Sequence, residues 1–256
     1  MKNIVLVFSG LIYATILAII APNGLAAKEI DHANQYRACM ALSKSTPQEA
    51  FDTALNWRDL GGGEAADHCI AAALIGLGQY KEAADRLEKL ADSAKQKADV
   101  KAGLLAHAAQ AWILAGNSTR AEAVLTAAMK LTPDDAILMI DRAQARAGHK
   151  DYTGAVNDLS HAIKLEDRRA DTFVFRASAY RLLDKLELAL ADVERALTLQ
   201  PWHPDGLLER GNLRRLRQDD AGARKDWLAV IRGDPGSPAA EAARRNLESM
   251  DVKTAQ

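Results

Sequence analysis

Two cysteines and a neighbouring histidine have the most reactive side chains in this sequence. Cys39 and Cys69 are the only cysteines among 256 residues, and His68 directly precedes the second. In an oxidising compartment an even number of cysteines favours a disulfide, and closing this loop would contribute about 3 to 4 kcal/mol. The alternatives are two buried free thiols or a metal or thiol redox site that includes His68. Adjacent helical residues point about 100° apart and no CxxC or HxxxH spacing is present, which weakens the metal alternative.

The remaining histidines form no recognisable catalytic or metal-binding pattern. They are His32, His107, His149, His161 and His203, and no two of them have the spacing of metal ligands. Residues 61–63 are three glycines, but they lack the preceding strand and the lysine of a phosphate-binding loop. No GxSxG nucleophile motif is present. The sequence therefore predicts a protein that is not an enzyme and binds neither a cofactor nor a metal.

Composition favours a helical protein. Apolar residues make up 48% of the chain but aromatic residues only 5%, so the core must be built largely from alanine and leucine, which suit closely packed helices. No long run of alternating β-branched residues predicts a strand. A net charge of -1 argues against nucleic-acid binding by the chain as a whole, although it does not exclude a local basic patch.

Small residues recur every 34 positions between residues 102 and 235. Three columns show this interval: Ala109, Ala143, Ala177 and Gly211; Ala121, Ala155, Ala189 and Ala223; and Ala128, Ala162, Ala196 and Val230. A fourth column contains Pro133, Asp167, Pro201 and Pro235. A repeat of this length is typical of stacked helical pairs. Small side chains let the two helices of a pair approach closely, and proline ends the second helix.

This pattern resembles the tetratricopeptide repeat (TPR) family, whose units are helix-turn-helix hairpins with small residues at these points. The resemblance implies an all-α fold, a right-handed α-α superhelical solenoid of TPR units. Two units depart from the pattern, because Arg146 and Arg214 replace the aromatic residues Trp112 and Tyr180. We expect those two units to pack less tightly.

The repeat register divides the chain into consecutive parts. These are a signal peptide or uncleaved anchor (1–27), a degenerate N-terminal helical hairpin (28–63), a TPR unit with an insertion (64–101), four TPR units (102–135, 136–169, 170–203 and 204–237), a C-terminal capping helix (238–250) and a frayed tail (251–256). The interval from Ala71 to Ala109 is 38 residues instead of 34. Four extra residues must therefore lie near 92–101, in an extended second helix or an exposed loop, where we expect the solenoid to bend.

The N-terminus has the pattern of a secretory signal peptide. Lys2 precedes the apolar run 4–20, which is followed by helix-breaking residues and then by Ala26 and Ala27. We therefore expect cleavage after one of these alanines and export to the periplasm or the medium. The alternative is an uncleaved anchor in the inner membrane with the repeats facing the periplasm, because the apolar run approaches a spanning length.

In the TPR family the first helices of the units line a concave groove that binds a peptide or a partner's helix. The resemblance assigns these groove positions to Gln110, Ile113, Ile140, Gln144, Val174, Ser178, Arg181, Leu208, Asn212 and Arg215. Relatives that grip a terminal carboxylate use a lysine and asparagine set on this face. Arg181, Asn212 and Arg215 match that set only loosely, so we assign no such specificity.

The last unit is locally basic. It contains Arg210, Arg214, Arg215, Arg217, Arg224 and Lys225, with acidic residues among them. We expect an ion-paired helix surface, and the alternative is a surface for an acidic partner or an anionic envelope surface.

Together these features predict a non-catalytic protein-protein interaction module, an adaptor or assembly factor of the cell envelope. Its partner would be a protein or peptide and not a nucleic acid, and it would contact a membrane only through an uncleaved N-terminus. Two alternatives remain: a structural subunit of a larger envelope complex, and the metal or thiol redox factor that would use Cys39 and Cys69.

Overall fold

The fold was analysed in a computed structural model, which describes residues 30–93 and 95–254, with side chains to residue 251. The chain divides into two compact units, residues 1–31 and 32–256. The predicted signal peptide lies outside the described residues. Within the described ranges the second unit contains helices and no strand, and none of these helices is both long and apolar enough to span a membrane.

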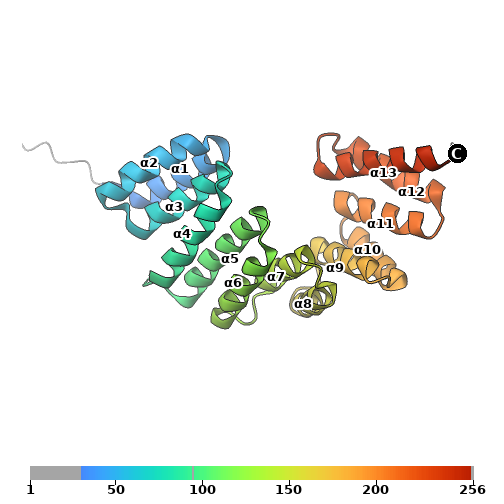
Figure 1. The fold of residues 1–256 in the computed structure, drawn as a ribbon, viewed down its shortest axis with the longest axis horizontal. Coiled ribbons are helices and arrows are strands. Elements are labelled where there is room, and N and C mark those ends of the chain that lie inside the picture. The colour runs from blue at the N-terminus through green and yellow to red at the C-terminus, as the bar shows by residue number, and fades with distance from the viewer. Residues whose placement is uncertain (1–29, 94, 255–256) are drawn as a thin grey trace, which may run out of the picture. The chain divides into compact units, whose positions relative to one another are not determined.

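Thirteen α-helices and one π-helical turn follow one another along the described residues (Figure 1). They are α1 (His32–Ser45), α2 (Pro47–Trp57), η1 (Arg58–Gly62), α3 (Gly63–Gly76), α4 (Tyr80–Ser93), α5 (Ala98–Leu114), α6 (Ser118–Leu131), α7 (Ala136–Gly148), α8 (Tyr152–Leu165), α9 (Ala170–Leu182), α10 (Leu186–Leu199), α11 (Pro204–Leu216), α12 (Asp220–Gly233) and α13 (Pro238–Thr254). Each helix packs on the next, and the first helices α5, α7, α9, α11 and α13 also contact one another in succession.

The columns of small residues lie where the two helices of a unit meet. Ala121, Ala155, Ala189 and Ala223 have no exposed surface. Gly211 takes the place of alanine in the last regular unit, because a Cβ atom there would come within 2.5 Å of the Trp227 indole. In the preceding unit the equivalent pair is Ala177 and the smaller Val193. The larger residue on one helix is thus compensated by the smaller residue on the other.

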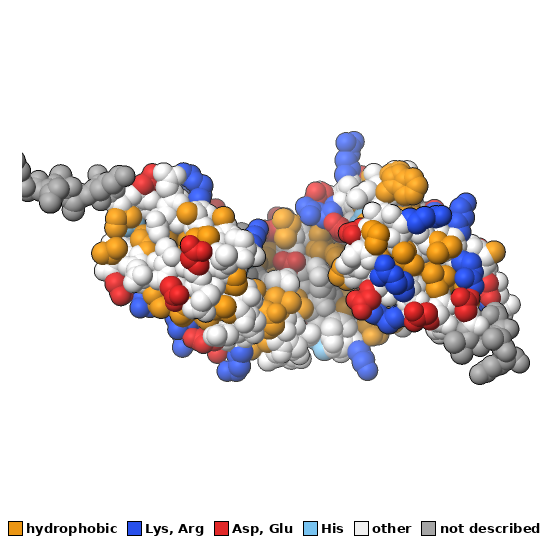
Figure 2. All heavy atoms as spheres, turned by 90° about the horizontal axis from the view of Figure 1, so that it is seen from above, with side chains coloured by type: hydrophobic (Ala, Val, Ile, Leu, Met, Phe, Trp, Pro, Cys, Tyr) orange, Lys and Arg blue, Asp and Glu red, His pale blue; other side chains and the backbone are white. Residues whose placement is uncertain are grey.

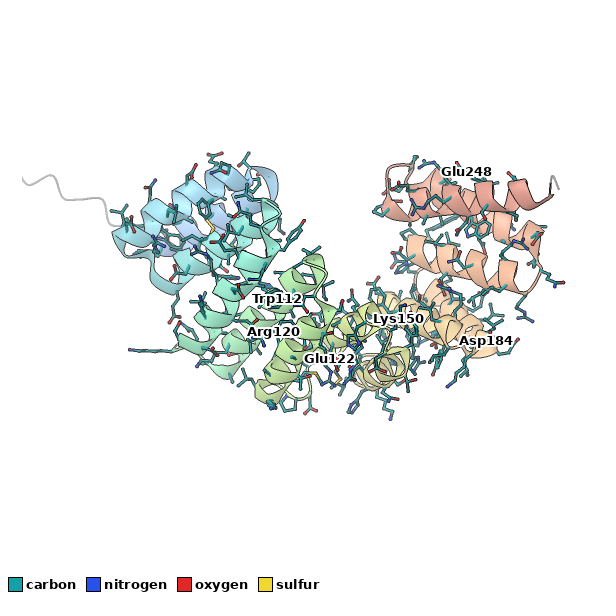
Figure 3. The ribbon with its side chains drawn as sticks, viewed as in Figure 1. Trp112, Arg120, Glu122, Lys150, Asp184 and Glu248 are labelled. Atoms are coloured by element: carbon teal, nitrogen blue, oxygen red, sulfur yellow. A yellow bond between two sulfur atoms is a disulfide. The ribbon has the colours of Figure 1, made fainter. Side chains whose placement is uncertain are left out.

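The turn between the two helices of each unit uses a left-handed backbone conformation. Gly116 has φ 76°, and the residues one, two and three repeats later, Lys150, Asp184 and Gln218, have φ 72°, 58° and 64°. Figure 3 marks Lys150 and Asp184 at these turns. The conformation ends the first helix, and it favours glycine, which has no Cβ atom to crowd the following carbonyl.

The four extra residues lie within the predicted segment 92–101, but they extend a first helix and form neither an extended second helix nor an exposed loop. The second helix α4 has 14 residues, the same length as α6. In contrast, α5 has 17 residues where α7 has 13. The helix α5 therefore begins one turn early, at Ala98. The start signals of α5 are weak, since Lys97 at its N-cap makes no side-chain cap bond, and this left its beginning hard to predict.

Both ends of the helical array differ from the predicted bounds. The first helix begins at His32, not at Lys28, and the last helix continues through the predicted frayed tail to Thr254. Met250 of α13 is only 3% exposed and packs in the core. Arg224 of α12 forms an ion pair with Asp251. These contacts extend order beyond residue 250.

A ladder of partly buried ion pairs runs through three units with the same 34-residue interval. Its members are the pairs Arg142–Asp158, Arg176–Asp192 and Arg210–Asp226, each joining the two helices of one unit by two hydrogen bonds of 2.7 to 2.9 Å. The remaining arm of each arginine donates to the second helix of the preceding unit, at Thr126, Ser160 and Glu194. Each ladder arginine therefore joins three helices.

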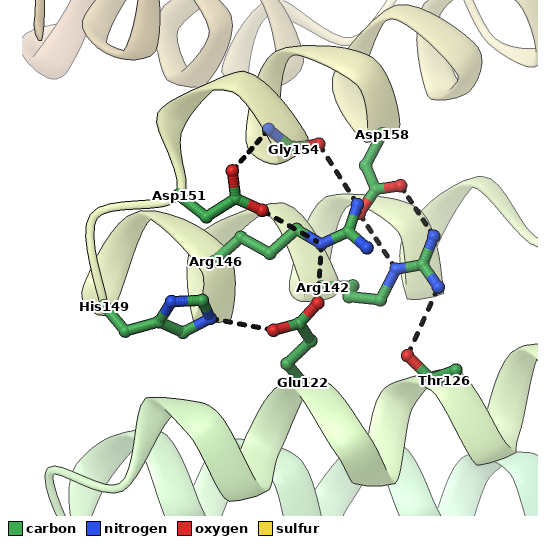
Figure 4. A network of polar contacts seen from close by, with 8 residues as sticks. All are labelled: Glu122, Thr126, Arg142, Arg146, His149, Asp151, Gly154 and Asp158. Atoms are coloured by element: carbon green, nitrogen blue, oxygen red, sulfur yellow. Dashed lines mark hydrogen bonds and ion pairs between the residues drawn. The ribbon is translucent and has the colours of Figure 1, made fainter.

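The arginines at the aromatic positions are part of the same network (Figure 4). Arg146 donates to Glu122 at 2.8 Å, to Asp158 at 2.9 Å and to the carbonyl of Gly154 at 3.2 Å. Arg214 repeats two of these contacts with Asp226 and the Gly222 carbonyl. Charge-assisted hydrogen bonds therefore occupy the place of the aromatic residue in these two units, and the expectation that they pack less tightly stays a prediction.

Candidate protein-interaction site

The first-helix face was predicted from ten positions, of which two are exposed, six are partly buried and two are buried. Gln110 and Gln144 are exposed, whereas Ile113, Ser178 and Leu208 are partly buried. Two positions were wrongly assigned as surface residues: Ile140 and Val174 are only 7% and 4% exposed and pack in core clusters.

A cavity of about 340 Å³ lies at the carboxyl-terminal end of this face. Three predicted residues, Arg181, Asn212 and Arg215, line it together with Leu216 and Trp227. The helix α13 completes the wall with three residues that sequence reasoning did not assign to a site: Asn246, Ser249 and Met250. The last helix therefore forms part of the site in addition to covering the end of the array.

The arginines of this cavity are held by carboxylates. Arg181 Nε lies 2.6 Å from Oε1 of Glu209, which is 5% exposed, and Arg215 Nη1 lies 2.8 Å from Asp220 Oδ1. The second oxygen of Glu209 accepts a 3.3 Å bond from Asn212 Nδ2. Both guanidinium groups are thus fixed in orientation and partly neutralised, while other nitrogen atoms of each group are left to face a ligand.

Asn212 connects three helices around the cavity. Its Oδ1 accepts hydrogen bonds from Trp227 Nε1 at 3.3 Å and from Asn246 Nδ2 at 2.8 Å. With its amide nitrogen on Glu209, every polar atom of its side chain is engaged. Asn212 therefore supports the site. The signal for Asn246 was present in the sequence, since it lies one repeat beyond Asn212 in the column that also contains Gln144 and Ser178.

Asp141 of α7 is a partly buried carboxylate on the same series of first helices. Burial raises the pKa of Asp141 from 3.8 to about 6, and the negative charge of Asp135 adds to this effect, while Arg169 opposes it. The charged form of Asp141 is therefore costly to the folded state near neutral pH.

The basic residues of the last unit are largely ion-paired. The five arginines have carboxylate partners: Arg210 and Arg214 pair with Asp226, Arg215 with Asp220, Arg217 with Glu187, and Arg224 with Asp251. On the face drawn in Figure 2, basic and acidic side chains likewise lie interspersed. These observations favour the predicted ion-paired surface over an uncompensated basic patch.

The two cysteines face each other across α1 and α3. Their Cα atoms are 6.2 Å apart, within the range of a disulfide, and both side chains are buried. Among the described residues no group of three or more histidine, cysteine, aspartate or glutamate side chains is arranged to hold a metal ion. The neighbouring His68 points to other partners and makes no group with the cysteines.

Sequence reasoning missed one pair of histidines. His68 and His107 belong to α3 and α5, and their Nε2 and Nδ1 atoms are 2.9 Å apart. Their separation of 39 residues includes the irregular interval, so no repeat column relates them. Three other histidines act as hydrogen-bond partners: His32 with Trp57, His149 with Glu122, and His203 with Asp171.

Comparisons with solved structures identify the fold. MamA residues 41 to the end, from Desulfovibrio magneticus RS-1, superposes with a TM-score of 0.58 at 18% identity, covering 68% of this chain and 97% of that one. YrrB, described as a TPR protein with an unusual peptide-binding site, gives 0.53 at 19% identity and covers 69% and 90%. The Cut9-Hcn1 hetero-tetramer of the APC/C gives 0.63 at 15% identity and covers 84% and 43%.

The sequence comparisons found no match, in contrast to the comparison of structures. No family model matches this chain, and neither does any curated protein. The likeness to solved structures, at 15 to 19% identity, is a likeness of fold. It confirms the predicted all-α superhelical solenoid, and the chain described here has the fold of the tetratricopeptide repeat proteins.

Proposed function

We propose that this protein is a non-catalytic interaction module that binds a peptide or a helix of a partner protein on its first-helix face. The observation that carries this proposal is the cavity between α9, α11 and α13. Residues predicted from the repeat register, Arg181 and Arg215, meet there with Asn246 from the last helix. The exposed amides of Gln110 and Gln144 lie on α5 and α7 of the same series.

The chemistry of this face suits a polypeptide ligand. Amide side chains can donate to carbonyl groups and accept from N–H groups of a backbone, and the unused guanidinium nitrogens of the cavity add further donors. The two arginines already have carboxylate partners, so the face does not present two uncompensated positive charges. Fold similarity to YrrB, which is described as having a peptide-binding site, supports the same class of ligand.

We further propose that the protein acts as an adaptor or assembly factor in the cell envelope. The apolar run at residues 4–20 and the following alanines support export. The facing pair Cys39 and Cys69 supports an oxidising compartment, and we propose that these residues form a disulfide there. Thiol titration of the unfolded, unreduced protein should detect no free thiol, whereas two titratable thiols would contradict this part of the proposal.

Partner capture from cells after mild crosslinking tests the binding face. One variant of the full chain combines Gln110→Arg with Gln144→Arg on the first helices. The matched control combines Asn157→Arg with His161→Arg on the second helix α8. All four residues are exposed, so both variants should fold. An Arg181→Glu change is unsuitable, because it would place a second carboxylate beside the buried Glu209.

We expect the wild type and the α8 control to capture the same proteins and the first-helix variant to lose them. Equal capture by all three chains would reject the proposed face. A partner recovered in fixed ratio would favour a structural subunit of a larger complex, and substoichiometric recovery would favour an adaptor.

A further inference from the structure

Three aromatic side chains from three first helices form a hydrogen-bonded chain. Tyr36 of α1 has its Oη 2.8 Å from Nδ1 of His68 on α3, and Nε2 of His68 lies 2.9 Å from Nδ1 of His107 on α5. The two imidazole rings are stacked with centroids 5.0 Å apart. Side chains alone therefore link α1, α3 and α5 along this line.

This chain lies where the repeat is irregular. The helix α5 begins a turn early, and its added length helps to form a cavity of about 260 Å³ beside His68. Tyr36, Glu64 and Gln96 line that cavity with the apolar Val100 and others. On the other side, α1 and α3 are held together by the paired cysteines. The histidine contact is thus a hydrogen-bonded side-chain link between the α1–α3 pair and α5.

The hydrogen-bonded chain can accommodate one added proton but not two. With both rings neutral, His107 Nδ1–H can donate to His68 Nε2 and His68 Nδ1–H to Tyr36 Oη, and a first added proton on His107 Nε2 leaves both bonds in place. A second proton places an N–H group on both nitrogens that face each other at 2.9 Å. The hydrogen bond is then replaced by an N–H to N–H contact between two positive charges, and the link must open.

The surrounding groups do not compensate such charges. Glu64, one turn before His68 on α3, accepts from the backbone N–H of Lys95 and from Gln96. Asp67 of α3, with Arg86 and Lys89 of α4, lines a separate cavity.

The two histidines differ in exposure, since His68 is partly buried and much of the His107 side chain reaches the surface. Desolvation of the buried part of each ring lowers the pKa of His107 and lowers that of His68 from 6.5 to about 4, where the charge of His107 adds to the effect. No charged group of α2 or α7 contributes to these shifts. Burial raises the pKa of Tyr36, so its phenol remains protonated throughout.

We infer that the Tyr36–His68–His107 chain is an acid-sensitive joint, which links α3 to α5 at neutral pH and releases this link when both histidines are protonated. The packing of α4 on α5 persists, so the opening is local to this face and to the adjoining cavity. The device would change the amino-terminal end of the first-helix face in acid without unfolding the array.

Hydrogen exchange of the full chain at pH 7 and pH 5 tests the joint, with rates corrected for the intrinsic effect of pH. A shift of the His68 pKa from 6.5 to about 4 predicts a rise of roughly 20-fold in the open population over this interval. We expect at least tenfold faster exchange around residues 64–68 and 100–107. His68→Gln should reduce the change below threefold, because an amide can bond both neighbours without acquiring charge. The control His161→Gln on α8 should behave as the wild type.

Imidazole nitrogen NMR of the wild type provides a second measurement that does not depend on a variant. It should show coupled titration of His68 and His107, with the His68 nitrogens protonating well below the ordinary range. Independent titration of both rings near 6.5, or unchanged exchange in the wild type between pH 7 and pH 5, would overturn the inference.

Discussion

The ion-pair ladder permits a stability test whose control is already present in the chain. Arg176 and Asp192 are joined by two hydrogen bonds of 2.7 Å, and their side chains are 18% and 9% exposed. One repeat before Arg142 and Asp158, the equivalent positions hold Ala108 and Val124, which are both buried. The same fold therefore accepts either an ionic or an apolar pair at this place.

Removing one member of the pair should be much more damaging than removing both. Asp192→Ala leaves the partly buried Arg176 guanidinium with Ser160 as its remaining hydrogen-bond partner, and we expect a loss of about 3 kcal/mol in unfolding free energy. Arg176→Ala leaves a buried carboxylate and should cost a similar amount. The double variant Arg176→Ala with Asp192→Val copies the Ala108 and Val124 pair and should lie within about 1.5 kcal/mol of the wild type.

Urea unfolding followed by circular dichroism measures this cycle in four proteins. The free energies are comparable only if the four transitions have the same urea dependence, because repeat arrays can lose cooperativity. We expect a coupling energy of several kcal/mol between positions 176 and 192. A single Asp192→Ala variant within 1 kcal/mol of the wild type (about the uncertainty of such comparisons), or a double variant as unstable as the sum of the singles, would refute it.

Three further changes have predicted outcomes. Asp141→Asn should stabilise the protein by about 1–2 kcal/mol at pH 7. The raised pKa of Asp141 makes the wild-type fold lose stability as pH rises from about 4 to about 6, and the variant avoids this loss. Thermal unfolding should therefore show the gain in stability vanish below about pH 4. Lys150→Gly should stabilise by about 0.5–1 kcal/mol and Asp184→Gly by less, since aspartate tolerates positive φ better; equal or negative effects in urea unfolding would contradict the turn argument. Gly211→Ala should cost about 1–3 kcal/mol, and Trp227→Val in the same chain should recover most of the loss in melting temperature.

The repeat made much of the fold predictable, and its irregular places were the parts that failed. Small residues in fixed columns predict helix contacts directly, because only small side chains allow that approach. The interval of 38 residues gives the number of added residues but not the helix that contains them. Because the start signal at Lys97 is weak, the beginning of α5 could not be placed from the sequence. Ile140 was misassigned because apolar residues near the edge of a helical face satisfy either a surface or a core pattern.

The polar networks were hidden for a different reason. Arg142 and Asp158 are 16 residues apart on antiparallel helices, so their pairing depends on the register between helices, which the sequence does not state. The repetition of the pair at intervals of 34 was the available signal. His68 and His107 had no such signal, because the irregular interval separates them.

The ladder arginines also affect how this molecule could change in length. Each one carries a contact within its own hairpin and another to the hairpin before it, at Thr126, Ser160 or Glu194. A hairpin duplicated in tandem between residues 136 and 237 would carry both the ladder arginine and the residue that the next ladder arginine contacts. The array could therefore grow there by whole hairpins. The junction before α5 has a different joint, in which Trp112 of α5 and Arg120 of α6 both donate to Glu88 of α4, so a hairpin inserted there would have to supply these partners instead.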